Sequence, residues 1–98
     1  MLMMKGKIFD WSNEKNALLK KERGVSFEQV VQAVKDSRLI TAIKHPNQKK
    51  YPHQKILVIE IEDYAYLVPC IESKTKIFLK TIFPSREFTK IYLEERRK

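Results

Sequence analysis

The sequence has little of several residue types, and each shortage excludes a class of protein. Its 98 residues include one cysteine, so no disulfide can form within the chain. Two glycines cannot build a glycine-rich phosphate loop, and together with four prolines they leave little material for linkers. No apolar run approaches membrane-spanning length, and the opening is too short and too basic for a signal peptide. We therefore expect a single cytoplasmic domain, residues 1–98, with no membrane partner.

Metal and thiol chemistry are also poorly supported. Cys70 lies in the apolar stretch from Ala65 to Ile71, which is typical of a buried structural thiol. His45 and His53 are the only histidines, and no cysteine and histidine spacing suits zinc. We expect no metal and no cofactor.

Positive charge, in contrast, is plentiful. Lysine and arginine number 20 against 12 acidic residues, for a formal net charge of +8. The segment from Lys74 to Lys98 has eight basic and three acidic residues, and the segment from Lys44 to Lys55 has four lysines, two histidines and no acid. Two basic segments thus flank an acidic middle, an asymmetry that would steer a polyanion such as RNA. The alternative is a solvated basic surface that only keeps the protein soluble.

Two helices are expected in the first half of the chain. Ser12 is a plausible N-cap, and Gly24 stands where a glycine would end that helix. Ser26 and Gln29 have the spacing of a capping box before valines that repeat with helical period, and this second helix should stop near Asp36.

Strands and a closing helix should follow. The predicted strands are Lys7 to Phe9, Leu39 to Lys44, Lys55 to Ile61, Tyr64 to Ile71, and Lys76 to Phe83. Short turns between the later strands favour an antiparallel meander. Ser85 is placed to cap a helix from Arg86 to about Arg97. The predicted fold is α+β, with a four- or five-stranded antiparallel sheet packed by two N-terminal helices and one C-terminal helix.

The last strand-to-helix junction brings Lys80 and Arg86 together as candidates for phosphate binding. Alternation predicts that Lys80 faces the same side as Phe78 and Ile82. Because an unpaired buried lysine is costly, Lys80 should snorkel, pair with a carboxylate such as Glu60, or open onto a polar groove. Arg86 offers a planar fork for two phosphate oxygens, although ordinary surface pairing is the alternative.

The loop from His45 to Gln54 and the closing helix supply further candidates. The ordinary pKa of histidine, near ~6.5, suits acid or base work, so His45 and His53 are catalytic candidates, with solvent-exposed bystanders as the alternative. Aromatic rings beside lysines favour RNA contacts, although half-buried tyrosines more often only pack. The RNA-binding candidates are Lys49, Lys50, Tyr51, Lys90 and Tyr92.

Both ends of the chain resemble a known family. The segments FDWSNEKN, residues 9–16, and RGVSFEQV, residues 23–30, resemble the opening of the BrnT toxin family, which pairs F-x-W-D-x-x-K with K-H-G-V-S-F-E-E-A. The tail IFPSREFTK, residues 82–90, stands where that family has I-I-S-A-R-[KR]-A-T. Arg23 replaces the family's histidine, and the central region does not follow the pattern. A related group of small domains carries R-G-[IV]-S-x-E-x-V at the same point.

The resemblance implies a RelE-related α+β fold and the toxin of a type II toxin–antitoxin pair. Such a toxin inhibits translation by cutting RNA and is neutralised by a cognate ribbon-helix-helix antitoxin. Arg86 matches the family's tail motif. A metal-independent endoribonuclease needs a base, an acid and a cation for the developing charge, and the catalytic candidates are Lys80, Arg86, His53 and His45. The alternative function is a non-catalytic RNA-binding or antitoxin-docking module.

Overall fold

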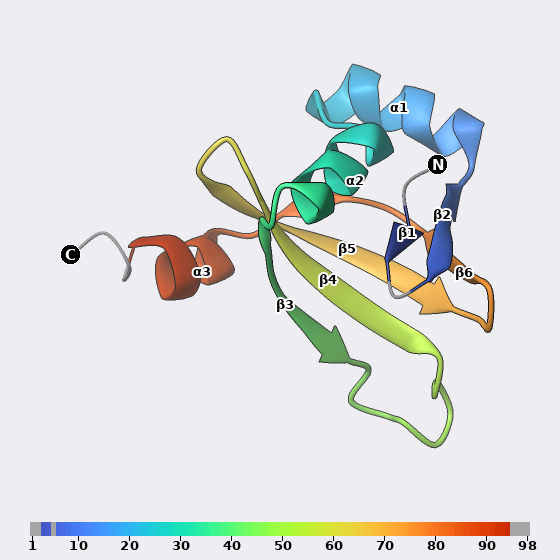
Figure 1. The fold of residues 1–98 in the computed structure, drawn as a ribbon. Coiled ribbons are helices and arrows are strands. Elements are labelled where there is room, and N and C mark those ends of the chain that lie inside the picture. Colours follow the sequence, from blue (N-terminus) through green and yellow to red (C-terminus); the bar gives the residue numbers. More distant parts are fainter. Residues whose placement is uncertain (1–2, 5, 95–98) are drawn as a thin grey trace.

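The chain forms an α+β fold, as the sequence predicts (Figure 1). The computed structural model describes residues 3, 4 and 6–94. In chain order the elements are β1 (Met3–Met4), β2 (Lys7–Trp11), α1 (Asn13–Arg23), α2 (Phe27–Lys35), β3 (Leu39–Lys44), β4 (Gln54–Ile61), β5 (Tyr64–Glu72), β6 (Lys76–Leu79), β7 (Phe83–Pro84), α3 (Arg86–Phe88) and a π-helical turn (Thr89–Glu94). No helix in this part of the chain has the length and apolar character needed to cross a membrane.

The ends of the two N-terminal helices follow the sequence signals. The hydroxyl of Ser12 accepts a hydrogen bond from the backbone N–H of Lys15 at 3.2 Å, and Gly24 ends α1 with a left-handed φ of 67°. Ser26 and Gln29 form the predicted capping box at the start of α2. Local capping therefore sets both helix starts.

A buried asparagine joins the two helices. The Asn16 side chain accepts from the backbone N–H of Phe27 at 2.8 Å and donates to Glu28 Oε1 at 2.7 Å. The Phe27 ring stacks against Trp11, with ring centroids 5.7 Å apart. These contacts fix α1 and α2 as one unit against the start of the sheet.

The sheet order is β1-β2-β6-β5-β4-β3, and β7 also pairs with β5. Strands β3 to β6 form the predicted antiparallel meander. β2 differs from that pattern because it pairs with β6 in parallel, from Ile8 opposite Lys76 to Trp11 opposite Leu79. The long connection that this parallel pair needs runs through α1, α2 and the strands β3 to β5. Seven strands result, against the four or five predicted, because β1 is added and the last strand is divided.

The predicted strand from Lys76 to Phe83 is interrupted. Cys70 lies opposite Leu79, and Leu67 lies opposite Phe83, so the last strand carries one more residue than β5 across the gap. An extra residue of this kind reverses the alternation of side chains beyond it.

The interruption changes which face Ile82 occupies. The alternation of side chains predicted that Ile82 faces the same side as Phe78 and Lys80, and this prediction is wrong. Ile82 is fully buried in the main core, whereas Phe78 and Lys80 are exposed. The carbonyl of Ile82 accepts a hydrogen bond from Arg23 Nη1 at 2.7 Å. α1 therefore satisfies a carbonyl that lies outside the sheet ladder.

The two faces of the sheet are covered unequally (Figure 1). The main core lies between one face and α1 and α2, and it includes Cys70, whose pKa burial raises to about 11, as expected for a structural thiol. On the other face, Leu93 packs in a smaller cluster with Val58 and Ala65 of the sheet. Leu93 belongs to the C-terminal helix, which consists of α3 and the π-helical turn. We call the face under α1 and α2 the helix-covered face and the opposite face the open face.

The C-terminal helix begins where the sequence predicts. The Ser85 hydroxyl accepts from the backbone N–H of Phe88 at 3.1 Å, and Thr89 Oγ1 accepts from the backbone N–H of Ala65 at 2.9 Å. The helical turns continue to Glu94, and the predicted end near Arg97 lies outside the described residues.

Candidate nucleic-acid interface

A basic pocket lies at the end of the sheet where β4 begins and β5 ends. Its volume is about 380 Å³, within the range of small-molecule sites. The lining residues are Lys7, Lys44, Gln48, Pro52, His53, Lys55, Glu72, Ser73 and Lys74. Four lysines against one carboxylate make the lining strongly positive, and we call it the lysine pocket.

Strand register brings these lysines together from distant parts of the sequence. Lys44 at the end of β3 pairs directly with Lys55 near the start of β4. The backbone N–H of Glu72, at the end of β5, donates to the His53 carbonyl at 2.8 Å. Lys7 begins β2, which joins the same end of the sheet through its pairing with β6. The pocket is therefore assembled from the ends of four strands.

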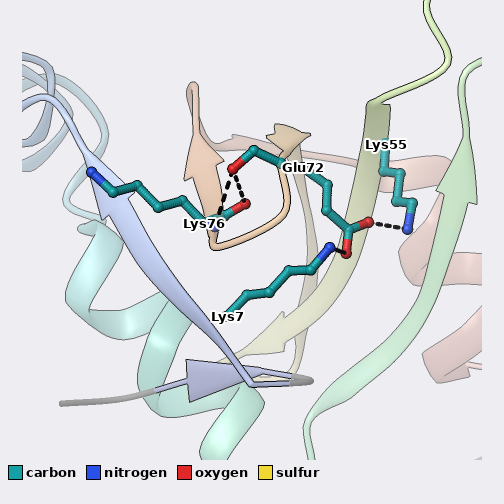
Figure 2. Close-up of polar contacts among 5 residues, drawn as sticks. Lys7, Lys55, Glu72 and Lys76 are labelled. Carbon is teal, nitrogen blue, oxygen red and sulfur yellow. Dashed lines mark hydrogen bonds and ion pairs between the residues drawn. The ribbon is translucent and has the colours of Figure 1, made fainter.

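Glu72 holds two of the lysines in place. Lys7 Nζ lies 2.7 Å from Glu72 Oε2, and Lys55 Nζ bonds to Oε1. Figure 2 shows the two ammonium groups approaching the carboxylate from different strands, while the Lys76 side chain extends away from it. These bonds, first from Lys55 and then from Lys7, lower the pKa of Glu72 from 4.5 to about 2.

The other two lysines have no such partner. Lys44 and Lys74 are exposed at the pocket rim, and neither forms an ion pair within the described part of the chain. An ionised Glu72 bonds to Lys7 and Lys55 but neutralises only one of their two charges, so uncompensated positive charge remains both beside Glu72 and at the rim. A phosphate group is the natural ligand for such a site, because charge-assisted bonds from lysine to phosphate are short and strong.

The two histidines occupy different environments. His53 is exposed and lines the lysine pocket. His45 packs its ring against Tyr51, with centroids 4.4 Å apart, and its Nδ1 accepts from the backbone N–H of Asn47 at 3.0 Å. His45 is thus part of the internal structure of the loop, and His53 is the histidine placed to meet a ligand.

The predicted RNA-binding residues of the loop lie beside the lysine pocket, outside its lining. Lys49 and Lys50 are exposed, and Lys50 Nζ lies 5.3 Å from the centre of the Tyr51 ring. This cation–π contact, together with the His45 ring, half-buries Tyr51. The tyrosine therefore packs within the loop, while the two lysines remain able to meet a phosphate chain.

Lys80 and Arg86 lie away from the pocket. The backbone N–H of Lys80 donates to the Pro69 carbonyl at 2.9 Å, and that of Ser85, the neighbour of Arg86, donates to the Ala65 carbonyl at 2.9 Å. At ~3.3 Å per residue, Ala65 is about 23 Å along β5 from Glu72. Arg86 and His53 are therefore at opposite ends of the sheet, and the four catalytic candidates do not form one centre.

The candidates of the closing helix accompany Arg86. Lys90 is exposed, and Tyr92 stacks on Phe88 with ring centroids 5.7 Å apart. Lys80 is exposed, which removes the desolvation cost that burial would impose. We call Arg86 and Lys90 the C-terminal basic surface.

Sequence reasoning named none of the pocket residues Lys7, Lys44, Lys55, Glu72 and Lys74 as a site residue. Lys44, Lys55 and Lys74 belong to recognisable basic segments, but Lys7 joins them only through the parallel pairing of β2 with β6. Glu72 is read from the sequence as a turn residue, and no local signal marks it as a bridge between two strands.

No group of three or more histidine, cysteine, aspartate or glutamate side chains within residues 3–4 and 6–94 is arranged to hold a metal ion. Comparison with known proteins adds no relative, since no protein-family model, no curated protein and no solved structure matches this chain.

Proposed function

We propose that this protein binds RNA by its phosphates at the lysine pocket and acts as the metal-independent endoribonuclease toxin of a type II toxin–antitoxin pair. The observation that carries the binding step is the convergence of Lys7, Lys44, Lys55 and Lys74 on one pocket. The cleavage step and the toxin role come from the resemblance of both ends of the chain to the BrnT family.

RNA is favoured over a small anion by the charge of the whole molecule. The net charge of +8 and the sequence pI of about 9.7 would attract a polyanion over many residues beyond the pocket. Lys49 and Lys50 extend the positive charge along the adjoining loop. A strand of several phosphates uses all of this charge, whereas an isolated phosphate uses only the pocket.

For cleavage, His53 is the acid–base group and the rim lysines stabilise the negative charge that develops on the phosphorane oxygens. An imidazole can take a proton from the 2′-hydroxyl or give one to the 5′-oxygen. Lys44 and Lys74 are positioned on the same pocket. Glu72 is a positioning residue, because a carboxylate with a pKa of about 2 that is bonded to two lysines is a weak base.

A non-catalytic RNA-binding or antitoxin-docking module is the second candidate. The engagement of Glu72 favours it, since His53 is then the remaining imidazole or carboxyl group of the lining that could exchange a proton with RNA. Both candidates share the phosphate-binding step, and they differ in whether His53 is needed for a reaction.

The experiment is a cleavage assay of single-stranded RNA by the purified protein in EDTA. We expect cleavage without metal, and we expect His53→Ala to reduce its rate by about 10²-fold or more while RNA binding is retained. His45→Ala is the matched variant and should cleave at close to the original rate. Activity that is lost in EDTA and restored by magnesium would contradict the metal-free mechanism. RNA binding without cleavage would favour the non-catalytic binding module over the endoribonuclease.

The partner is tested separately. By resemblance, a ribbon-helix-helix antitoxin encoded beside this chain should suppress cleavage on titration. If it covers the lysine pocket, its association should slow as salt rises, since surface charges act mainly on the association rate. Undiminished cleavage with the partner demonstrably bound would show that the pocket is not masked.

A further inference from the structure

Strand β6 and Lys80, the residue that follows it, present an alternating basic and aromatic surface on the open face. Lys76, Phe78 and Lys80 are exposed, while Ile77 and Leu79 between them are buried in the main core. The exposed fraction of Phe78 is 37%, and this residue is one of four exposed large hydrophobic residues in the described part of the chain. A single exposed aromatic ring is common on a protein surface, but a ring placed between two lysines combines an apolar face with positive charge on both sides.

The ring has an apolar neighbour on the adjoining strand. Ile71 lies directly opposite Phe78 in the register of β5 and β6 and is itself 38% exposed. The C-terminal helix covers the other end of this face, over Val58 and Ala65. Phe78 and Ile71 therefore form a small apolar platform that the helices within residues 6–94 leave exposed.

The platform is continuous with the lysine pocket. Ile71 is followed directly by Glu72, which points into the pocket on the other face, and Lys74 lies in the turn that joins β5 to β6. The turn is tight, because the backbone N–H of Ser73 donates to the Lys76 carbonyl at 2.8 Å. An extended ligand bound to Lys74 at the pocket rim therefore crosses only this turn before it reaches Phe78.

We propose that Phe78 stacks against a base of single-stranded RNA, whose phosphates contact Lys76 and Lys80 and whose chain continues around the β5–β6 turn into the lysine pocket. This deepens, and rests on, the RNA binding proposed above. Aromatic side chains on a sheet, flanked by cations, are the general means by which proteins hold unpaired bases without reading their sequence.

Charge selects this occupant over an apolar protein segment. The two lysines that flank Phe78 would be desolvated under an apolar partner, whereas they match the phosphates on either side of a stacked base. Lys76 Nζ lies 3.7 Å from Asp10 Oδ2, but both side chains are about half exposed, so this ion pair is weak and can yield to a phosphate. Lys80 has no ion pair within residues 6–94.

The test compares strands with and without bases. Binding of the whole protein to a 2′-O-methyl oligoribonucleotide, which cannot be cleaved, and to an abasic strand of equal length is measured by fluorescence anisotropy. Phe78→Ala should weaken binding of the base-containing strand by about 5- to 150-fold and leave the abasic strand unchanged. Phe78→Leu should behave like the alanine variant, and Phe78→Tyr should restore binding. Leu18→Ala, at an exposed apolar position on α1, is the matched control.

Three results would overturn the proposal: equal losses for both strands, no loss for either, or a change from dimer to monomer on Phe78→Ala, which would make the platform a contact between copies of the chain. Thermal unfolding of each variant separates these results from loss of the fold. Failure of the proposed RNA binding at the lysine pocket gives a different result. In that case the double variant Lys44→Ala with Lys74→Ala leaves the binding of both strands unaltered.

Discussion

The lysine pocket and the C-terminal basic surface lie at opposite ends of the same sheet, and most of their cations come from the two basic segments of the chain. In the lysine pocket, four strand ends converge and Glu72 anchors two of the lysines. At the other end, Arg86 and Lys90 extend from exposed positions of the C-terminal helix and form no ion pair within the described residues.

Basic residues that look alike in the sequence therefore form two different kinds of surface, a pocket at one end of the sheet and an exposed helix surface at the other. In the lysine pocket, the two exposed rim lysines share one cavity with the two lysines that Glu72 holds, so all four can act on the same phosphate. Arg86 and Lys90 lie on the surface of the C-terminal helix and contribute mainly a long-range field, which salt screens. The four predictions below test this difference in construction through RNA binding and stability, beginning with the largest effect.

Removal of the two rim lysines should have the largest effect on RNA binding. Lys44→Ala with Lys74→Ala should weaken binding by about 25-fold at 0.1 M salt, because each lost phosphate contact on a single strand is worth about 5-fold there. The slope of log affinity against log salt should fall by about 1.4. Anisotropy titrations over a salt series measure both. Lys21→Ala with Lys35→Ala, at exposed helix positions, removes equal charge and should cost clearly less.

The contact between α1 and the interrupted strand should govern stability. Arg23→Ala removes the donor to the Ile82 carbonyl and should lower the free energy of unfolding by about 1.5 kcal/mol. Since this bond lies between the positions of Lys80 and Arg86, the C-terminal basic surface should be disturbed before the lysine pocket. Urea unfolding and hydrogen exchange provide the measurements. Arg23→Lys keeps a donor and should recover part of the loss, and equal instability in both variants would contradict this role.

Glu72 should make stability depend on acid. Its pKa is depressed from 4.5 to about 2 in the folded protein, so its stabilising effect is full above about pH 4.5 and is lost as the pH falls toward 2. Glu72→Gln should lower the free energy of unfolding at pH 7 by about 1 kcal/mol and remove this part of the acid dependence. Urea unfolding at pH 7 and near pH 3 measures both. A difference between the two proteins that stays constant with pH would show that Lys7 and Lys55 do not hold the carboxylate.

The C-terminal basic surface should show the smallest effect. Arg86→Ala with Lys90→Ala removes as much charge as the rim variant, but it should weaken RNA binding by only about 5-fold or less at 0.1 M salt. The same titrations make the comparison direct. A loss equal to or greater than that of the rim variant would reverse the order of the two regions and restore Arg86 as the principal phosphate contact.

Local signals in the sequence were enough to predict much of the fold. Ser12, Gly24 and Ser26 set helix ends through bonds within a few residues, and the strands from β3 to β5 follow apolar runs separated by short turns. The interruption between Leu79 and Phe83 was not predicted, because apolar residues such as Phe78 and Leu79 occupy both alternating sets of this segment, so the sequence alone does not show where the alternation shifts. Its effect appears only in the register with β5.

The candidate site shows the same division. By itself the sequence determined the excess of positive charge, the identity of the basic segments, and the capped helices that frame them, since these depend on composition and on neighbours along the chain. Only the tertiary structure decided that Lys7 and Glu72 join Lys44, Lys55 and Lys74 in one pocket, and that Arg86 lies at the far end of the sheet. The reason is physical: the parallel pairing of β2 with β6 links residues about seventy positions apart, and no local propensity encodes a contact at that separation.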